Sequence, residues 1–260
     1  MTNPPPPQTG EECRVTVVVP ALNEAENLPH VLPNIPDWVH EVVLVDGGST
    51  DGTPDVARSL LPEIKIVAPE RFGKGAALLA GFAAATGDVV VTLDADGSMD
   101  PAEIARFQEA LVGGADYAKG SRYLPGGGSD DLSFVRALGN GCLVRLVRLL
   151  FGCRFTDLCY GYNAVWKRVL PAMALDCDGF EIETLMNIRA VRAGLRIIEV
   201  PSYERPRIFG VSRLNAVKDG WRVLRTIARE RLRSRRPYDN GSTAKASPVV
   251  VGTGRGSGST

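Results

Sequence analysis

Histidine is scarce in this chain of 260 residues, and its cysteines follow no metal-binding pattern. There are two histidines, His30 and His40, and none of the five cysteines has a C-x-x-C partner, so neither a zinc site nor a dithiol redox centre is expected. The odd number of cysteines also argues against a complete disulfide framework.

Long apolar runs and an excess of one charge sign are lacking as well. No uncharged apolar segment approaches the roughly 18 residues that a transmembrane helix requires. The first residues, MTNPPPPQTGEE, have neither the basic start nor the apolar core of a secretory signal. The 30 Lys and Arg residues balance the 30 Asp and Glu residues, so the net charge does not point to an acidic partner. We therefore expect a cytoplasmic enzyme with no nucleic-acid partner.

Composition divides the chain into three parts. Residues 1–12 are rich in proline and are expected to be a disordered leader. Residues 13–236 have the length and pattern of one domain, which ends in a basic amphipathic helix over 214–236. Residues 237–260 are rich in Ser, Gly, Thr and Ala, which predicts a disordered tail.

The hydrophobic pattern predicts strands alternating with helices. Apolar runs predict strands at Val15–Val19, Glu41–Asp46, Ile64–Ala68, Val89–Leu93 and Asp116–Lys119. Helices are expected at Pro54–Leu61, Lys74–Ala85 and Pro101–Leu111. This alternation indicates an α/β fold with a mostly parallel sheet flanked by helices, in which ligands bind beyond the carboxyl ends of the strands.

Two carboxylates follow the fourth predicted strand in the segment VVVTLDADGSMDP. Asp94 and Asp96 are two residues apart, so in extended chain they point to the same side. Their repulsion is relieved by a cation, and hard oxygen ligands suit Mg²⁺ or Mn²⁺, which also hold substrate phosphates. The alternative for this pair is an Asp-rich turn before the next helix.

Four motifs stand in order: VVVPALNEAENL, LVDGGSTDGT, GKGAALLAGF and LDADGSMDP. Together they resemble the family 2 inverting glycosyltransferases, and within that family the dolichyl- and polyprenyl-phosphate sugar synthases. The resemblance extends from about Val15 to about Trp221. It implies the GT-A fold, a Rossmann-like sheet flanked by helices, with a Mg²⁺ or Mn²⁺ cofactor and a nucleotide-sugar donor, GDP-mannose or UDP-glucose.

The resemblance also implies a donor site. Three of its residues have alternative readings: Glu24 as an acid in the first turn of a helix, Asp46 as a turn residue, and Lys74 as part of a glycine turn. Asp51 is expected to be a turn residue. Asp94 and Asp96 would hold the metal, and the residues expected to bind the nucleotide sugar are Pro20, Ala21, Glu24, Val45, Asp46, Lys74, Asp94, Ala95, Asp96 and Arg122.

Two positions depart from the family pattern, and a third differs from some relatives. Leu22 stands where an aromatic residue is usual, and Gly47 replaces the second acid of the V-D-D motif. Both positions belong to the expected nucleotide pocket, so the base is not determined by the resemblance. Ser98 stands where some relatives have a glutamine beside the metal.

The second half of the chain is expected to bind the acceptor. In TDLCYGYNAVW, Asp157 occupies an acidic position of the family and either orients the acceptor or caps a helix. The loop 205–213 resembles a family segment whose arginines could fold over a phosphorylated acceptor. The expected acceptor-binding residues are Arg122, Arg207, Ser212 and Arg213, and the expected catalytic residues are Asp94, Asp96, Asp157 and Arg207.

Two acceptor classes stay open. A polyprenyl phosphate is already anionic near neutral pH and needs no strong general base. A hydroxyl on a small molecule or a cell-wall sugar would need one, and the candidates are Asp157, Glu181 and Glu183. For the two glutamates, an acid on a helix surface is the commoner role. The apolar segment Leu143–Phe151 and the basic helix favour a lipid acceptor and a peripheral position at the cytoplasmic face of a membrane. In the alternative, the helix packs its apolar stripe on the domain and exposes its basic row to solvent. The stripe comprises Leu214, Val217, Trp221, Leu224 and Ile227, and the basic row comprises Lys218, Arg222, Arg225 and Arg229.

Other classes fit less well. A nucleotidyltransferase would carry a Gly-rich loop with Arg and Lys after the first strand, and a dinucleotide-binding dehydrogenase would carry G-x-G-x-x-G there. Neither motif follows Val15–Val19. A non-catalytic binding module on the same fold would not need both Asp94 and Asp96.

Overall fold

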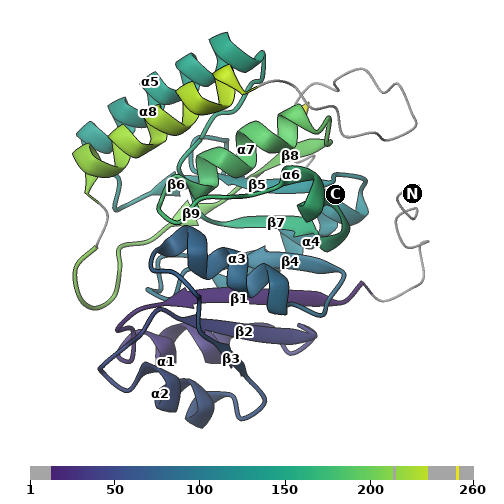
Figure 1. Ribbon diagram of the computed structural model, residues 1–260. Helices are drawn as coiled ribbons and strands as arrows, with labels where there is room; N and C mark the ends of the chain where they lie inside the picture. Colours follow the sequence, from purple (N-terminus) through teal and green to yellow (C-terminus); the bar gives the residue numbers. More distant parts are fainter. Residues whose placement is uncertain (1–12, 213–214, 234–249, 252–260) are drawn as a thin grey trace, which may run out of the picture.

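A mostly parallel sheet forms the centre of the computed structural model, which describes residues 13–212, 215–233 and 250–251 (Figure 1). Its strand order is β10-β8-β5-β7-β4-β1-β2-β3. Within it, β7 runs antiparallel to both β4 and β5, and the other pairings are parallel. The strands are β1 (Val15–Ala21), β2 (Glu41–Asp46), β3 (Lys65–Val67), β4 (Val89–Thr92), β5 (Tyr117–Ser121), β7 (Asn163–Trp166), β8 (Ile197–Pro201) and β10 (Val250–Val251).

Helices cover both faces of this sheet, with α3 and α7 in front and α4 behind in Figure 1. Two short strands, β6 (Gly128–Ser129) and β9 (Tyr203–Glu204), form a separate parallel pair. The helices are α1 (Leu28–Val31), α2 (Thr53–Leu60), α3 (Lys74–Ala84), α4 (Ile104–Val112), α5 (Phe134–Phe151), α6 (Leu170–Met173), α7 (Ile182–Arg192) and α8 (Ala216–Leu232), with 3₁₀ turns at Leu32–Asn34, Pro101–Glu103 and Lys167–Val169.

The core lies where the central strands meet these helices. In β1 the side chains of Val17, Val18 and Val19 are completely buried, and β4 is buried along its whole length. Strands buried on both faces read as continuous apolar runs, which is why the sequence identified them. The mixed α/β sheet flanked by helices is the predicted fold class.

Two long helices lie side by side beyond α7, at the top of Figure 1. Ser133 caps the start of α5, and the Asn215 side chain accepts hydrogen bonds from the first turn of α8. The helix predicted over 214–236 spans Ala216–Leu232 in the described part of the chain.

Most of both predicted disordered ends lies outside the residues that the structure describes. The proline-rich leader over 1–12 and most of the tail over 237–260 lie outside the described residues. Within the predicted tail, Val250–Val251 form β10 beside β8, so this pair is a strand where composition predicted disorder. No helix among the described residues has the length and apolarity to cross a bilayer.

Candidate active site

A cavity of about 660 Å³ opens at the carboxyl ends of β1 and β4, where the sequence placed the ligand. It extends from the two aspartates after β4 as far as α5 and α8. Of the predicted site residues, those lining it are Pro20, Ala21, Glu24, Lys74, Asp94, Ala95, Asp96, Arg122, Arg207 and Ser212.

Two predicted donor residues do not line this cavity. Val45 is completely buried in the core, so its side chain cannot contact a nucleotide, which corrects the prediction for this residue. Both carboxylate oxygens of Asp46 accept from the Ser49 N–H at 3.2 Å, which is the turn arrangement given as its alternative. Gly47, one residue further on, lines the cavity instead.

Hydrogen bonds connect the loop after β1 to the loop after β2. The Glu24 N–H donates to the Thr53 hydroxyl at 2.9 Å, and the Ala25 N–H donates to Asp51 at 3.0 Å. Asp51 also accepts from the Thr53 N–H, so it is the turn residue that the sequence predicted. Leu22 and Gly47, the two departures from the family pattern, both line the cavity next to this junction.

Lys74 joins two carboxylates from distant parts of the chain. Its ammonium lies 2.8 Å from Asp94 Oδ1 and 3.0 Å from Glu183 Oε1. Burial favours the uncharged forms and raises the pKa of both Asp94 and Glu183, whereas the two carboxylates outweigh burial at Lys74 and raise its pKa. A Cβ at Gly161 would come within 2.7 Å of Lys74 Nζ, so a larger residue there would displace the ammonium from this cluster.

The structure corrects the prediction for Glu183, which favoured an acid on a helix surface. The residue lies in the first turn of α7, but its side chain is buried and paired with Lys74. Its neighbour Glu181 occupies the N-cap position of the same helix.

Asp96 lies next to a loop from the other end of the domain. Its Oδ1 accepts from the Ser98 N–H at 3.0 Å and from the Ser98 hydroxyl at 2.6 Å. Its Oδ2 lies 3.5 Å from Arg207 Nε, which is buried and has no hydrogen-bond partner. Asp96 therefore keeps one oxygen at the cavity wall, beside the Nε of a guanidinium whose other nitrogens pair elsewhere.

The loop over 205–212 crosses the cavity and packs on the aspartate turn. The Ile208 N–H donates to the Asp96 carbonyl at 3.2 Å, and the Arg205 N–H donates to the Ser98 carbonyl at 2.8 Å. Gly97 has a φ of +79°, and a Cβ there would lie 2.4 Å from Ile208 Cδ1. The turn after Asp96 thus needs glycine both for its backbone conformation and for this contact.

Arg207 makes a bidentate ion pair with Glu24. Its Nη2 lies 2.7 Å from Glu24 Oε1, and its Nη1 lies 2.8 Å from Glu24 Oε2. Burial opposes the charge, but Glu24 and Asp96 together raise the pKa of Arg207. Ser212 lies at the cavity, and Arg213 lies outside the described residues.

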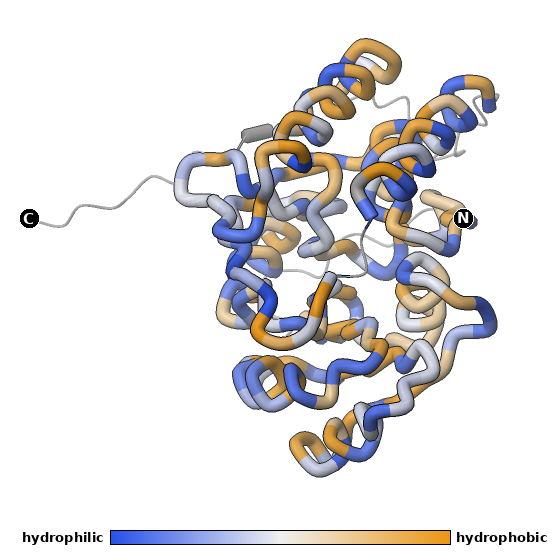
Figure 2. Tube along the Cα trace, turned by 90° about the vertical axis from the view of Figure 1, so that its left-hand side faces the viewer, coloured by the Kyte–Doolittle hydropathy of each residue, from blue (hydrophilic) through white to orange (hydrophobic). Residues whose placement is uncertain are grey.

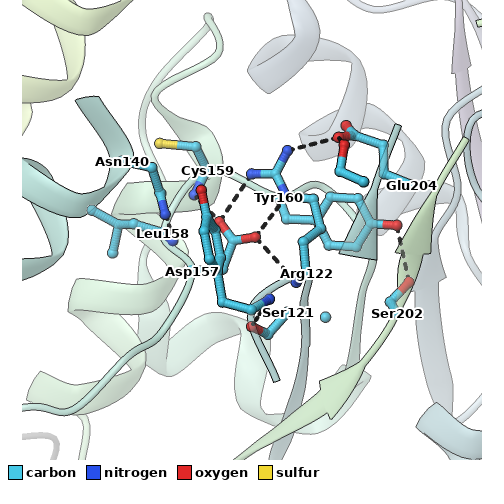
Figure 3. A network of polar contacts seen from close by, with 12 residues as sticks. Ser121, Arg122, Asn140, Asp157, Leu158, Cys159, Tyr160, Ser202 and Glu204 are labelled. Carbon is cyan, nitrogen blue, oxygen red and sulfur yellow. Dashed lines mark hydrogen bonds and ion pairs between the residues drawn. The ribbon is translucent and has the colours of Figure 1, made fainter. Parts of the chain in front are cut away.

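Arg122 is the centre of a buried polar network (Figure 3). Its Nε donates to Asp157 Oδ2 at 2.7 Å, its Nη2 donates to Asp157 Oδ1 at 3.0 Å, and its Nη1 donates to Glu204 at 2.9 Å. The guanidinium also lies 4.9 Å from the centre of the Tyr160 ring, a cation–π distance. Both carboxylates raise the pKa of Arg122 against the effect of burial.

Asp157 does not cap a helix, which corrects the alternative given for it. It lies in the segment between α5 and β7, is completely buried, and is held by Arg122. Burial opposes its charge, but Arg122 and Lys119 outweigh burial and lower the pKa of Asp157. In this arrangement its observed partner is Arg122.

Several charged residues in and around this network were not predicted from the sequence. Lys119 and Glu199 are completely buried on β5 and β8, and burial lowers the pKa of Lys119 and raises that of Glu199. Glu204 on β9 pairs with Arg122. The available signal was a charge inside an apolar strand, Lys119 in YAKGS and Glu199 in IIEVP, because a charge rarely enters a core without a partner.

A divalent metal at the cavity wall would have few protein ligands. Among the described residues, no group of three or more His, Cys, Asp or Glu side chains is arranged to hold a metal. Asp96 keeps Oδ2 at the cavity, whereas both oxygens of Asp94 lie within 2.9 Å of Lys74. One or two carboxylates completed by substrate phosphates and water form the coordination that Mg²⁺ favours.

An α/β sheet with a D-x-D turn and a basic loop at its carboxyl edge is the arrangement of a nucleotide-sugar transferase. The family described as Glycosyl transferase family 2 matches residues 16–168. The chain belongs to this family, and it is a glycosyltransferase.

Two curated relatives cover most of the chain. It is 34% identical over 219 residues to the polyprenol monophosphomannose synthase of Mycolicibacterium smegmatis, with 78% of this chain and 81% of that protein covered. It is 35% identical over 214 residues to the undecaprenyl-phosphate mannosyltransferase of Micrococcus luteus, with 78% and 88% covered.

Solved structures agree on the fold. The chain superposes on glucosyl-3-phosphoglycerate synthase from Mycobacterium tuberculosis in complex with uridine diphosphate, with a TM-score of 0.66 and 26% identity over 84% of this chain and 80% of that one. The same enzyme in complex with Mn²⁺, uridine diphosphate and its product gives a TM-score of 0.66 at 24% identity, with 84% and 80% covered.

Proposed function

We propose that this enzyme transfers a hexose from a nucleotide diphosphate sugar to a polyprenyl phosphate, with inversion and with Mg²⁺ or Mn²⁺. The observation that carries the proposal is that one continuous cavity of the described residues joins the Asp94–Asp96 turn to the helix pair α5 and α8. A donor would lie at the aspartates, and the phosphate of a lipid acceptor would enter from the helices.

Two of the three carboxylates that a hydroxyl acceptor could use are already engaged. Asp157 is held by Arg122, and Glu183 is held by Lys74. Glu181 is not engaged in this way, since its Oε2 has no hydrogen-bond partner, but it is not among the residues that line the described cavity. A phosphate monoester has a second pKa near about 6 and is largely dianionic near neutral pH, so it attacks without a general base. These engagements favour a phosphate acceptor.

Each part of the site would have a distinct task. A divalent metal on Asp96, supported by Asp94, would supply Lewis acidity to the leaving diphosphate. Arg207, and Arg136 further along the cavity, would place positive charge where the donor and acceptor phosphates meet. Lys74 would fix Asp94 beside the metal position through its ion pair.

The surface of α5 and α8 supports a membrane-bound acceptor. On α5 the exposed residues Phe134, Leu138 and Leu149 share one face at helical spacing. On α8 Val217 is 84% exposed and Trp221 is 69% exposed, and both helices carry apolar and polar residues along their length (Figure 2).

The charges of α8 have the sign that an anionic membrane attracts. Both of its acids, Asp219 and Glu230, are buried, so its exposed charges are basic: Lys218, Arg222, Arg225, Arg229 and Arg231. The predicted stripe is divided, because Ile227 packs inside while Val217 and Trp221 face outward. Exposed apolar residues beside basic ones are typical of helices that lie in a membrane interface.

The donor is proposed from the relatives. Both curated relatives are named for mannose transfer, which favours GDP-mannose, whereas the crystallised structural relative binds uridine diphosphate. The structural relative, named for the transfer of glucose to phosphoglycerate, also makes a soluble acceptor the second candidate.

A radiolabelled transfer assay tests the proposal. GDP-mannose and UDP-glucose are supplied in turn with Mg²⁺ or Mn²⁺, with and without polyprenyl phosphate. We expect metal-dependent label in the organic phase with GDP-mannose. Metal-dependent donor turnover that yields only water-soluble product would contradict the lipid acceptor and favour the second candidate.

A further inference from the structure

Asn27 bridges the two loops that close over the cavity, although its side chain does not line it. The residue stands at the N-cap position of α1, yet its side chain does not cap that helix. It is 2% exposed. Its amide reaches across to a segment more than 180 positions away in the chain.

The Asn27 amide satisfies two partners at once. Its Nδ2 donates to Glu24 Oε2 at 2.6 Å and to the Phe209 carbonyl at 3.2 Å, and its Oδ1 accepts from the Phe209 N–H at 2.9 Å. Both backbone groups of Phe209 are thus bound by one side chain, as a neighbouring strand would bind them. Only a side-chain amide offers a donor pair and an acceptor at this reach.

Arg207 donates to the same two acceptors. Its Nη1 lies 2.8 Å from Glu24 Oε2 and 3.2 Å from the Phe209 carbonyl. Asn27 therefore fixes the carboxylate and the loop carbonyl between which the guanidinium is placed. With both held, Arg207 Nε points toward Asp96 and has no hydrogen-bond partner of its own.

We propose that Asn27 is a positioning residue, which couples the donor loop at Glu24 to the loop over 205–209 and so sets the Arg207 guanidinium beside Asp96. Its effect on lipid phosphate transfer rests on the proposed function, but its effect on the loop does not. Packing of the His30 and Phe209 rings, whose centroids are 5.6 Å apart, supports the same closed arrangement.

Limited trypsin digestion tests the coupling without any substrate. Trypsin cleaves after arginine, and mass spectrometry follows the Arg207–Ile208 bond in the full chain. We expect Asn27→Ala to speed this cleavage at least about fivefold, because the loop loses two hydrogen bonds at Phe209 and opens more often. Asn34→Ala is the matched control, since this exposed asparagine donates only locally to the His30 carbonyl. Equal cleavage rates in the Asn27→Ala and wild-type proteins would overturn the proposal.

A double-mutant cycle separates positioning from general damage. We expect Asn27→Ala to lower kcat/KM for polyprenyl phosphate about tenfold, while the Kd of the nucleotide changes less than about twofold. In an Arg207→Ala background the same change should cost less than about twofold, because its target is gone. Independent, multiplicative losses would show a merely structural role. A wild-type enzyme that does not use polyprenyl phosphate would contradict the proposed function and leave the trypsin result to decide this one.

Asn27→Asp adds a signature in the pH profile. At neutral pH the new carboxylate faces Glu24 and repels it, and it cannot donate. When it is protonated, it can donate to Glu24 again, so the ratio of variant to wild-type activity should rise as the pH falls from 8 toward 5.5. The other ionisable groups nearby are Arg207, which pairs with Glu24, Asp96, which lies beside Arg207, and His30, which packs on Phe209; all three are common to both proteins. A ratio that stays flat over this pH range would contradict the donation to Glu24.

Discussion

Asp96 is the side chain on which metal dependence should rest, because Lys74 already occupies both oxygens of Asp94. We expect Asp96→Asn to weaken Mn²⁺-dependent binding of the nucleotide by more than about tenfold, the scale at which even outer-shell changes affect metal sites. Isothermal titration of GDP and UDP, with and without Mn²⁺, measures this. Asp55→Asn is the control, since Asp55 is 86% exposed on α2. Mn²⁺-dependent affinity that is unchanged in Asp96→Asn would rule out this ligand.

Asp157 is expected to govern stability through Arg122. Removing one charge of a completely buried pair costs about 3–5 kcal/mol, and here Glu204 still partners the guanidinium, so we expect Asp157→Asn to fall at the lower end. Chemical unfolding at pH 7 measures the loss. A destabilisation as small as that of Asp55→Asn would show that Glu204 alone satisfies Arg122.

The same pair predicts how stability changes with pH. The pKa of Asp157 is lower in the folded than in the unfolded chain, so its contribution is present above the unfolded pKa of about 4 and is lost as the pH falls through the folded pKa. The difference in unfolding free energy between the wild type and Asp157→Asn should therefore narrow below about pH 4. A difference that is constant between pH 7 and pH 3 would contradict the charge argument.

Among the elements, the exposed apolar side chains of α8 make a prediction about membranes. Burying a large apolar side chain contributes about 1.5–3 kcal/mol, so Trp221→Ala should lower partition onto anionic vesicles about tenfold or more. Vesicle sedimentation measures this, with Trp38→Ala as the matched control because Trp38 is 47% exposed just before β2. Equal losses in the two variants would argue against α8 as the contact.

The basic residues of α8 should act through charge alone. Each basic residue near an anionic surface contributes about 1 kcal/mol, so the double change Arg222→Gln and Arg225→Gln should weaken binding to anionic vesicles but not to neutral ones. The same loss on neutral vesicles would indicate that the helix itself had been disturbed.

The elements that the sequence predicted well are those whose signal is local. β1, β2 and β4 are buried apolar runs, and α3 follows a glycine turn, so their positions follow from short segments. The antiparallel β7 between β4 and β5 was not predictable in this way, because pairing depends on contacts between distant parts of the chain. α1 is only four residues long, with Pro29 inside it and Pro33 just after it.

The site residues follow the same rule: those with a local signal were predicted, and pairings between distant segments were not. Asp94, Asp96 and the motif residues around them were found because each motif is contiguous. The partners Glu183 for Lys74, Glu24 for Arg207 and Glu204 for Arg122 come from other elements, so the sequence could not pair these charges, and it did not indicate Glu204 at all. Val45 was misplaced for a related reason, since a strand residue before a binding turn can point into the core.

At the level of the whole molecule, one cavity connects the Asp94–Asp96 turn to the helix pair α5 and α8, so the proposed phosphate chemistry and the proposed membrane contact should be separable by experiment. A short, water-soluble prenyl phosphate reaches the Asp94–Asp96 end without a membrane. If the proposal holds, transfer to polyprenyl phosphate in anionic vesicles requires contact by α5 and α8 as well. Raising the salt from 50 to 500 mM shortens the Debye length from roughly 14 Å to roughly 4 Å, so it should slow transfer to the vesicle acceptor much more than transfer to the soluble one.

The variants should divide between the two acceptors in the same way. We expect Trp221→Ala to reduce transfer only to the vesicle acceptor, because this side chain lies outside the cavity, whereas Asp96→Asn should reduce both. Initial rates with each acceptor at both salt concentrations measure this. If Trp221→Ala slowed both reactions equally, the helix pair would shape the catalytic cavity, and the membrane would have to be met by another surface. A selective loss would mean that the enzyme recognises its acceptor twice, by its phosphate in the cavity and by its membrane at the helices.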